Sequence, residues 1–244
     1  ILDWENFRDL QLAFLKASVP EIETPTDIAI LGVLHQIASE YGIRYVISGG
    51  NFATEGILPK SWQYNAKDTR YIRAIHHKYG KTDKIKIPLF SFFEELYYKF
   101  IKKIRIIYIL NLVDYNKEKA MQHLTENLDW QYYGGKHHES LYTGFVQSYI
   151  LPVKFNIDYR KATLSTLICK GEISREQALE DLKLPSFNPE KVAIEKALIC
   201  EKLEITEDTF DKIMAEPAKS YRNYPNSKKS LECLYSIYRK LKRY

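Results

Sequence analysis

The 244 residues suffice for one large domain or two small ones, and a hydrophobic fraction of 45% is enough to bury a core. The formal net charge is only +5 and most basic residues are dispersed, which argues against a protein dedicated to binding nucleic acid. No apolar run reaches about 18 residues, so we expect no membrane span and a cytoplasmic protein. Three widely spaced cysteines argue against a disulfide framework and a zinc site.

Helical periodicity dominates the first forty residues. An apolar stripe predicts a first helix from residue 4 to residue 15. A second helix is predicted to begin near Thr26, an N-cap candidate after Pro25, and to stop at Gly42. The N-terminal part of the chain is therefore expected to begin with two consecutive helices.

One short segment, Ile43–Ser48, reads as a strand because it is rich in β-branched residues and ends at two glycines. Its composition is typical of a buried parallel strand. One strand cannot form a sheet alone, so we expect its neighbours to come from a preceding segment that is absent from this sequence. In open α/β sheets, ligands bind beyond the carboxyl ends of the strands, which makes residues 48–56 the first candidate site.

The rest of the chain is predicted to be mostly helical. The sequence from Ser174 to Gln177 is typical of a capping box at the start of a helix. The stretch 92–112 is predicted to be helical or partly extended. The other predicted helices cover residues 68–78, 116–128, 139–149, 190–202 and 207–214.

Two loops near the predicted strand are candidates for ligand contact. The turn 48–56 contains Ser-Gly-Gly but lacks the aspartate and second serine of a pyrophosphatase loop, S-G-G-x-D-S. It is either a tight strand-to-helix connection or a turn that contacts a ligand. The following loop, 58–65, contains a proline and aromatic residues. It either covers a ligand or packs against its own domain.

Two later segments carry charged side chains suited to chemistry. In residues 133–139, Lys136 is a candidate for holding a phosphate, and His137 with Glu139 for moving protons. A plain helix-capping loop is the alternative, and the spacing specifies no third metal ligand. Arg160 and Lys161 are suited to a pyrophosphate or a carboxylate, or else mark the solvated start of a helix.

Six segments of the sequence carry a resemblance to a known family: 3–11, 14–20, 25–27, 47–59, 134–137 and 152–155. The run Gly-Gly-Asn-Phe-Ala-Thr-Glu-Gly-Ile-Leu-Pro is the most specific part of them. Together, over roughly residues 1 to 225, these segments resemble the N-acetyl sugar amidotransferase family of bacterial surface-polysaccharide and O-antigen biosynthesis. That family belongs to the PP-loop ATP pyrophosphatase superfamily.

The resemblance implies an α/β fold of the adenine nucleotide α-hydrolase type, a doubly wound parallel sheet. Only the later part of that sheet would be present here, followed by an α-helical C-terminal region. The implied divisions are residues 1–66 for the distal part of the nucleotide-binding domain and 67–225 for a helical region that contacts substrate or partner. Residues 226–244 would form a basic C-terminal helix.

The implied activity is the ATP-dependent conversion of an acetamido group of a nucleotide-linked sugar into an acetamidino group through an adenylated intermediate. Mg²⁺ would neutralise the phosphates of ATP, and ammonia would come from a separate glutaminase subunit of the class found in histidine biosynthesis. The missing N-terminal half would supply the S-G-G-x-D-S loop. This chain alone is therefore expected to be incomplete as an enzyme.

The resemblance also implies roles for individual residues. It assigns Asp27, Gly49, Gly50, Asn51, Thr54 and Glu55 to the nucleotide, and Lys136, His137 and Glu139 to catalysis. It assigns Tyr64, Asn65, Arg160 and Lys161 to the substrate, and no residue to a metal.

Two other functions stay open at this point. One is a non-catalytic or RNA-binding module, because enzymes that modify tRNA share the pyrophosphatase fold. The other is a remnant that only docks a partner. The catalytic hypothesis differs from both because it predicts an exposed apolar surface beside the strand Ile43–Ser48, or a partner that covers it.

Overall fold

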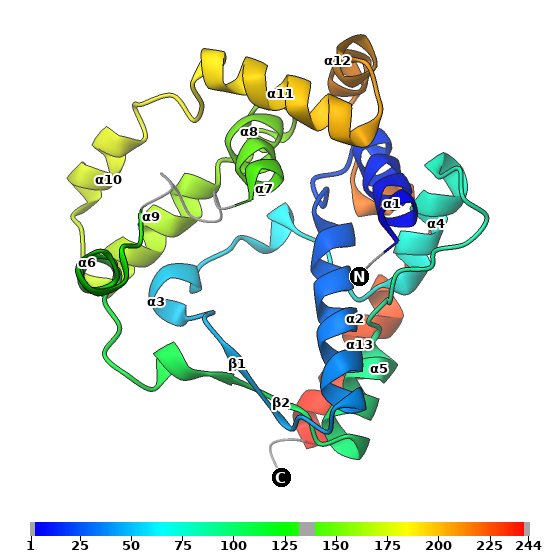
Figure 1. Ribbon diagram of the computed structural model, residues 1–244, viewed down its shortest axis with the longest axis horizontal. Helices are drawn as coiled ribbons and strands as arrows, with labels where there is room; N and C mark the ends of the chain where they lie inside the picture. The colour runs from blue at the N-terminus through cyan, green and yellow to red at the C-terminus, as the bar shows by residue number, and fades with distance from the viewer. Residues whose placement is uncertain (1–2, 132–139, 242–244) are drawn as a thin grey trace. The chain divides into compact units, whose positions relative to one another are not determined.

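The computed structural model describes residues 3–131 and 140–241 (Figure 1). These residues are mostly helical and contain a small parallel sheet of two strands, β1 (Tyr45–Ser48) and β2 (Arg105–Tyr108). The chain divides into two compact units, each built from discontinuous segments. Unit 1 comprises Ile1–Val46, Gln63–Arg105 and Glu216–Tyr244, and unit 2 comprises Ile47–Trp62 and Ile106–Ala215.

Helices form nearly all of unit 1. Asp3 begins the first one by accepting a hydrogen bond from the amide of Asn6 (3.2 Å), and Asp68 caps another by accepting bonds from the amides of Arg70 and Tyr71. The elements of unit 1 are α1 (Trp4–Ala17), α2 (Thr24–Glu40), α4 (Thr69–Tyr79), α5 (Phe92–Leu96), the π-helix η2 (Tyr97–Ile101), η5 (Tyr221–Asn223) and α13 (Lys228–Leu241).

The core of unit 1 lies where α1 packs against α4 and α2 (Figure 1). Phe14 of α1 and Tyr71 of α4 meet edge to face with ring centroids 5.9 Å apart. Gly32 lets α2 approach the segment before α5, because a Cβ at this position would lie 2.4 Å from the carbonyl oxygen of Pro88. The buried members of this core are Leu10, Ala13, Phe14, Ala17, Val19, Ile28, Ala29, Tyr71, Ile72, Ile75, Ile87, Phe90 and Tyr224.

The C-terminal segment of unit 1 contacts the earlier helices of that unit through hydrogen bonds and an aromatic pair. The hydroxyl of Tyr224 donates to the carbonyl of Ala17 (2.7 Å), and the amide of Ser227 donates to the Asp68 carboxylate (2.5 Å). The α13 helix then packs on α5 through Tyr235, whose ring lies 4.8 Å from that of Phe92. Residues more than 150 positions apart thus share one core.

Unit 2 is also helical. Phe145 contacts Phe210 of a helix far along the chain, with ring centroids 5.8 Å apart, and Lys154 donates to the last carbonyls of that helix, at Ile213 and Met214. The elements of unit 2 are α3 (Phe52–Glu55), η1 (Lys60–Trp62), η3 (Ile109–Asn111), α6 (Lys117–Leu128), α7 (Leu141–Phe145), the π-helix η4 (Val146–Ile150), α8 (Leu151–Phe155), α9 (Tyr159–Lys170), α10 (Arg175–Asp181), α11 (Pro189–Leu203) and α12 (Glu207–Ala215).

The sheet corrects the expectation that the predicted strand takes its neighbours only from outside this sequence. The predicted strand, β1, pairs with β2. β2 lies within the stretch 92–112, which was predicted to be helical or partly extended. The amide of Arg105 donates to the carbonyl of Arg44 (2.8 Å) where both strands begin, and Gly50 lies against the ring of Tyr108 where both end. The strands are therefore parallel. The β-branched residues Ile106 and Ile107 favour the extended conformation of β2.

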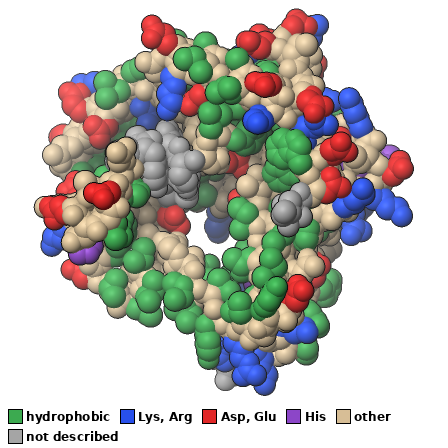
Figure 2. Space-filling model, viewed as in Figure 1, with side chains coloured by type: hydrophobic (Ala, Val, Ile, Leu, Met, Phe, Trp, Pro, Cys, Tyr) green, Lys and Arg blue, Asp and Glu red, His purple; other side chains and the backbone are tan. Residues whose placement is uncertain are grey.

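Both strands carry exposed apolar side chains. Ile47 of β1 is 69% exposed and Tyr108 of β2 is 49% exposed. In Figure 2, hydrophobic side chains gather over β2 and the segment that follows it, which includes Leu112 at 77% exposure. Parallel strands are normally covered on both faces, so exposed apolar side chains on this sheet are unusual. The exposed surface predicted beside the strand is confirmed.

Most predicted helices are confirmed with shifted ends. The second helix begins at Thr24 instead of after Thr26, because Pro25 occupies its first turn, where a proline has a suitable φ and needs no amide. The predicted capping box at Ser174 and Gln177 is present, with reciprocal bonds of 3.1 and 2.8 Å. Within the described residues, no helix is both long and apolar enough to cross a bilayer.

Candidate functional site

The turn after β1 satisfies its own amides. The Ser48 hydroxyl accepts from the amide of Gly50 (3.2 Å), and Asn51 accepts from the amide of Thr54 through its side chain (2.9 Å) and from that of Glu55 through its carbonyl (3.1 Å). Four positions of the predicted nucleotide contact are therefore held in place by short-range bonds. Asn51 acts as the N-cap of α3 and is itself 8% exposed.

One further amide of the turn is bound from the segment after β2. The amide of Phe52 donates to the side chain of Asn111 (2.8 Å). A phosphate cradle needs several amides that point at an anion without another acceptor. As folded, four amides of this turn, those of Gly50, Phe52, Thr54 and Glu55, already have protein acceptors and do not point at an anion. The assignment of Gly49, Gly50 and their neighbours to a nucleotide stays a prediction.

The α9 helix lies beside this turn. The amide of Ile57 donates to the Thr166 hydroxyl (3.1 Å), and that hydroxyl donates to the carbonyl of Ala162 one turn earlier (3.0 Å). At the start of α9, the ring of Trp62 lies 5.8 Å from that of Tyr159. Unit 2 therefore brings together the turn after β1 and the helix that carries Arg160 and Lys161.

Arg160 already has partners within unit 2. Its guanidinium makes a bidentate contact with Asp158, with a shortest distance of 2.7 Å, and also donates to the carbonyls of Leu184 and Pro185. Burial opposes ionisation of Asp158, but the hydrogen bonds from Arg160 outweigh it and lower the pKa of that carboxyl. Lys161 is exposed, and of the two basic residues it is the one that faces solvent.

The remaining predicted contacts in the described part of the chain fall in unit 1. Asp27 lies exposed in the first turn of α2. Tyr64 stacks on Tyr221 with centroids 4.3 Å apart and donates to the Asp68 carboxylate (2.5 Å). Burial, followed by the Asp68 hydrogen bond, raises the pKa of the Tyr64 phenol. Asn65 accepts from the amide of Lys67 (3.0 Å). Tyr64 thus serves the packing of unit 1.

The three predicted catalytic residues, Lys136, His137 and Glu139, lie outside the described residues. Among residues 3–131 and 140–241, no three histidine, cysteine or carboxylate side chains are grouped as they would be around a metal ion.

One comparison with known proteins adds to this geometry. Residues 139–242 match the family "LPS biosynthesis protein WbpG-like, C-terminal domain". The match covers fewer than half of the residues, and it extends from unit 2 into α13 of unit 1. This part of the chain is thus similar to a domain of lipopolysaccharide biosynthesis proteins. No curated protein and no solved structure matches the chain.

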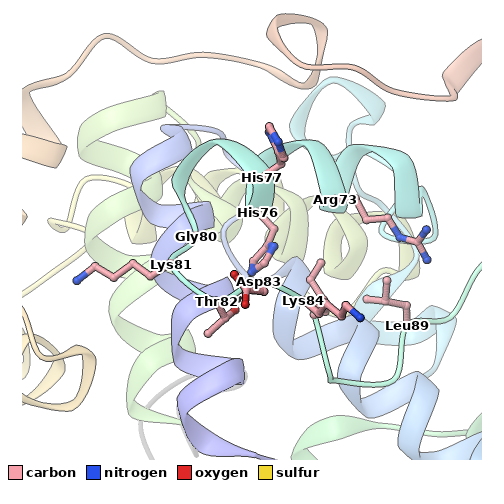
Figure 3. Close-up of a pocket in the computed structure, with 10 residues that line it drawn as sticks. Arg73, His76, His77, Gly80, Lys81, Thr82, Asp83, Lys84 and Leu89 are labelled. Atoms are coloured by element: carbon pink, nitrogen blue, oxygen red, sulfur yellow. Dashed lines mark hydrogen bonds between the residues drawn. The ribbon is translucent and has the colours of Figure 1, made fainter.

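Unit 1 contains a pocket that the sequence did not indicate as a site. It has a volume of about 710 Å³ and lies where the C-terminal end of α4 meets the following loop (Figure 3). A lysine-rich run, Lys81-Thr-Asp-Lys-Ile-Lys86, and the pair His76-His77 were the available signals. The lining residues are Arg73, His76, His77, Gly80, Lys81, Thr82, Asp83, Lys84, Ile85 and Leu89.

A buried carboxylate lies under the loop of this pocket. Asp9 of α1 accepts bonds from the amide of Lys81 (2.8 Å) and from the amide and the hydroxyl of Thr82 (2.9 and 2.8 Å). Burial opposes ionisation, but these hydrogen bonds outweigh it and lower the pKa of Asp9. His76 meets both Asp9 (3.2 Å) and Thr82 (2.9 Å) through the same ring nitrogen, Nε2.

The group Asp9, His76 and Thr82 has the residue types of a catalytic triad but not its geometry. In a triad, the acid and the hydroxyl contact different nitrogens of the imidazole, so that a proton moves across the ring. Here both contact Nε2, and the Thr82 hydroxyl donates directly to the acid. The group is therefore a structural network that fixes the loop.

Proposed function

We propose that this chain is part of an ATP-dependent amidotransferase of lipopolysaccharide and O-antigen biosynthesis. The match of residues 139–242 to a domain of LPS biosynthesis proteins carries this proposal. The specific run Gly49–Pro59 lies outside the match and adds independent support from the first half of the chain. The enzyme would act in the cytoplasm, where ATP is available.

In the proposed reaction, the acetamido oxygen of a nucleotide-linked sugar attacks the α-phosphorus of MgATP, and pyrophosphate leaves. Ammonia from a glutaminase partner adds to the imidate carbon. AMP then leaves with the former acetamido oxygen, and the sugar retains an acetamidino group. Adenylation is needed because the oxygen of a neutral amide is a poor leaving group.

The residues that bind the phosphates of ATP would lie on strands that adjoin β1 and β2. Two observations support this placement of the ATP site. Four amides of the turn after β1 have protein acceptors, and the strands themselves carry exposed apolar side chains such as Ile47 and Tyr108. A sheet of two short strands gains little stability alone, and neighbouring strands would bury these side chains. Lys161, Lys136 and His137 would serve the sugar nucleotide.

An oxygen-labelling experiment tests the chemistry. The chain is produced together with the segment that carries the S-G-G-x-D-S loop, then supplied with MgATP, ammonium and an acetamido sugar nucleotide whose acetamido oxygen is ¹⁸O. We expect sugar-dependent release of pyrophosphate and ¹⁸O in the AMP. A sugar nucleotide with a free amine in place of the acetamido group is the control and should release none.

Two results would reject the proposal. If no pyrophosphate is released with the complete protein, adenylation does not occur. If ¹⁸O appears in inorganic phosphate together with ADP, the oxygen is activated by phosphorylation, which is a different reaction. Glutamine should replace ammonium only when the glutaminase partner is added.

A further inference from the structure

The pocket of unit 1 has a marked charge imbalance. Arg73, His77, Lys81 and Lys84 contribute basic side chains, and Asp83 contributes the one carboxylate among the lining residues. All five are exposed. In Figure 2, lysine and arginine side chains lie near a histidine over α4 and the loop after it, with acidic side chains close by. Clustered cations of this kind raise the local concentration of anions.

The loop of residues 81–86, which carries Lys81 and Lys84, is fixed by hydrogen bonds to side chains of α1. Asn6 of α1 donates to the carbonyl of Lys84 (2.7 Å) and accepts from the amide of Lys86 (2.6 Å). With the three bonds from Lys81 and Thr82 to Asp9, two buried side chains of α1 therefore fix residues 81 to 86. A loop fixed in advance loses little conformational entropy when a ligand binds.

A close approach at the start of the loop adds to this rigidity. A Cβ on Gly80 would lie 2.6 Å from Cδ2 of His76 and 2.7 Å from the carbonyl oxygen of the same residue. Glycine thus lets the chain turn directly over the imidazole and bring Lys81 and Thr82 down to Asp9. The backbone of the pocket is accordingly set by contacts that do not depend on any ligand.

The side chains around the pocket differ in direction. In Figure 3, Arg73 and Lys84 lie on the side of Leu89, whereas Lys81 extends the opposite way. Arg73 and Lys84 therefore form the pair best placed to share one ligand. Leu89 gives that side an apolar surface next to the charges. Arginine and lysine beside an apolar wall suit a ligand that has both phosphate oxygens and a less polar part.

We propose that this pocket binds the phosphate groups of a small ligand of nucleoside diphosphate size, with Arg73 and Lys84 as the principal contacts. Its volume of about 710 Å³ lies within the range of small-molecule sites. A small phosphorylated molecule fits better than a nucleic acid, because the cations line one pocket while the net charge of the whole chain is only +5. The inference does not rest on the amidotransferase reaction.

Calorimetric titration of the 244-residue chain tests the site, with inorganic diphosphate, UDP and uridine as probes. We expect diphosphate and UDP to bind and uridine not to bind. The double variant Arg73→Ala/Lys84→Ala should weaken UDP binding by about tenfold or more, because two charged contacts are lost. Both side chains are exposed, so the variant should unfold at the same temperature as the parent chain.

Lys86→Ala is the matched control. Lys86 belongs to the same loop and carries the same charge, but it does not line the pocket and instead pairs with Asp3 (3.4 Å). Its removal should change UDP binding by less than about twofold. If Lys86→Ala weakened UDP binding as much as the double variant does, the proposal would be overturned, since UDP would then respond to the general positive charge of the loop and not to this pocket. No binding of diphosphate at about 5 mM would also overturn it, as would tight binding of single-stranded RNA in place of UDP.

Discussion

Thr82 donates two hydrogen bonds to Asp9, one from its backbone amide (2.9 Å) and one from its hydroxyl (2.8 Å). A residue of the loop after α4 thereby fills the acceptor sites of a carboxylate on α1, more than 70 positions earlier. The His76 imidazole closes the same network from α4. This contact joins the α1–α4 core to the cationic pocket, so that the geometry of the pocket depends on the packing beneath it.

Asp9→Asn should destabilise unit 1. The Lys81 and Thr82 amides would lose a charged acceptor, and the NH₂ group of the new side chain would point a donor at groups that are themselves donors. We expect a loss of about 2 to 4 kcal/mol in the free energy of unfolding, measured by chemical denaturation. Asp83→Asn, in the same loop but exposed, should cost less than about 0.5 kcal/mol. If both variants lost the same free energy of unfolding, the hydrogen bonds to Asp9 would not be what stabilises this loop.

The stability of the chain should fall as pH rises across the titration of Glu21. Burial, partly offset by hydrogen bonds that include one from the Tyr71 hydroxyl (3.2 Å), raises the pKa of this carboxyl from 4.5 to about 7. The folded state therefore holds a proton that the unfolded state releases between these values, and ionisation inside the fold costs free energy. Stability should be highest below about pH 4.5 for this group and should decline until about pH 7, by on the order of 3 kcal/mol.

Glu21→Gln isolates this effect. Glutamine keeps an acceptor for the Tyr71 hydroxyl but does not titrate, so the decline between about pH 6 and 7 should disappear from denaturation curves. Below about pH 6 a decline should remain, because desolvation also raises the pKa of Asp27 to about 6. Glu201→Gln, at an exposed position of α11, should leave the decline unchanged. If stability still falls between about pH 6 and 7 in Glu21→Gln, the raised pKa of Glu21 is not the cause.

Gly32→Ala should destabilise α2 against its neighbour. Alanine is a better helix former than glycine by about 1 kcal/mol, but its Cβ would lie 2.4 Å from the oxygen and 2.9 Å from the carbon of the Pro88 carbonyl. Because the obstacle is backbone, relief requires a shift of the chain, and we expect a net cost of about 2 to 3 kcal/mol. Gly49→Ala, where nothing lies within 4 Å of the added Cβ, should be nearly neutral in the same thermal unfolding measurement.

Thr166→Val should loosen the contact between α9 and the segment after α3. Valine has the shape of threonine but cannot accept the hydrogen bond from the Ile57 amide (3.1 Å). We expect a cost of about 1 kcal/mol and faster hydrogen exchange at Ile57. Thr163→Val is the control, because the Thr163 hydroxyl bonds only within its own helix, to Tyr159 (3.4 Å). Unchanged exchange at Ile57 would mean that the bond does not hold this segment.

The candidate site was only partly predictable. The turn after β1 was recognised from its position after a strand, and α9 does lie beside it. The partners of Arg160, however, include carbonyls 24 and 25 positions later, which no local pattern specifies. The pocket at Arg73 and Lys84 was missed because a lysine-rich run has the same sequence pattern in a solvated loop as in a loop that is hydrogen-bonded to a buried helix.

The sequence by itself determined the local elements of this protein. Asp68, Asn116 and Ser174 determine where α4, α6 and α10 begin. Each is an N-cap whose side chain accepts hydrogen bonds from amides two or three residues later. Only the tertiary structure decided that Arg105–Tyr108 pairs with β1 and that Asp9 lies under the loop of residue 82. A cap needs only neighbouring residues, whereas strand pairing and a buried carboxylate depend on groups brought together from distant positions by the collapse of the whole core.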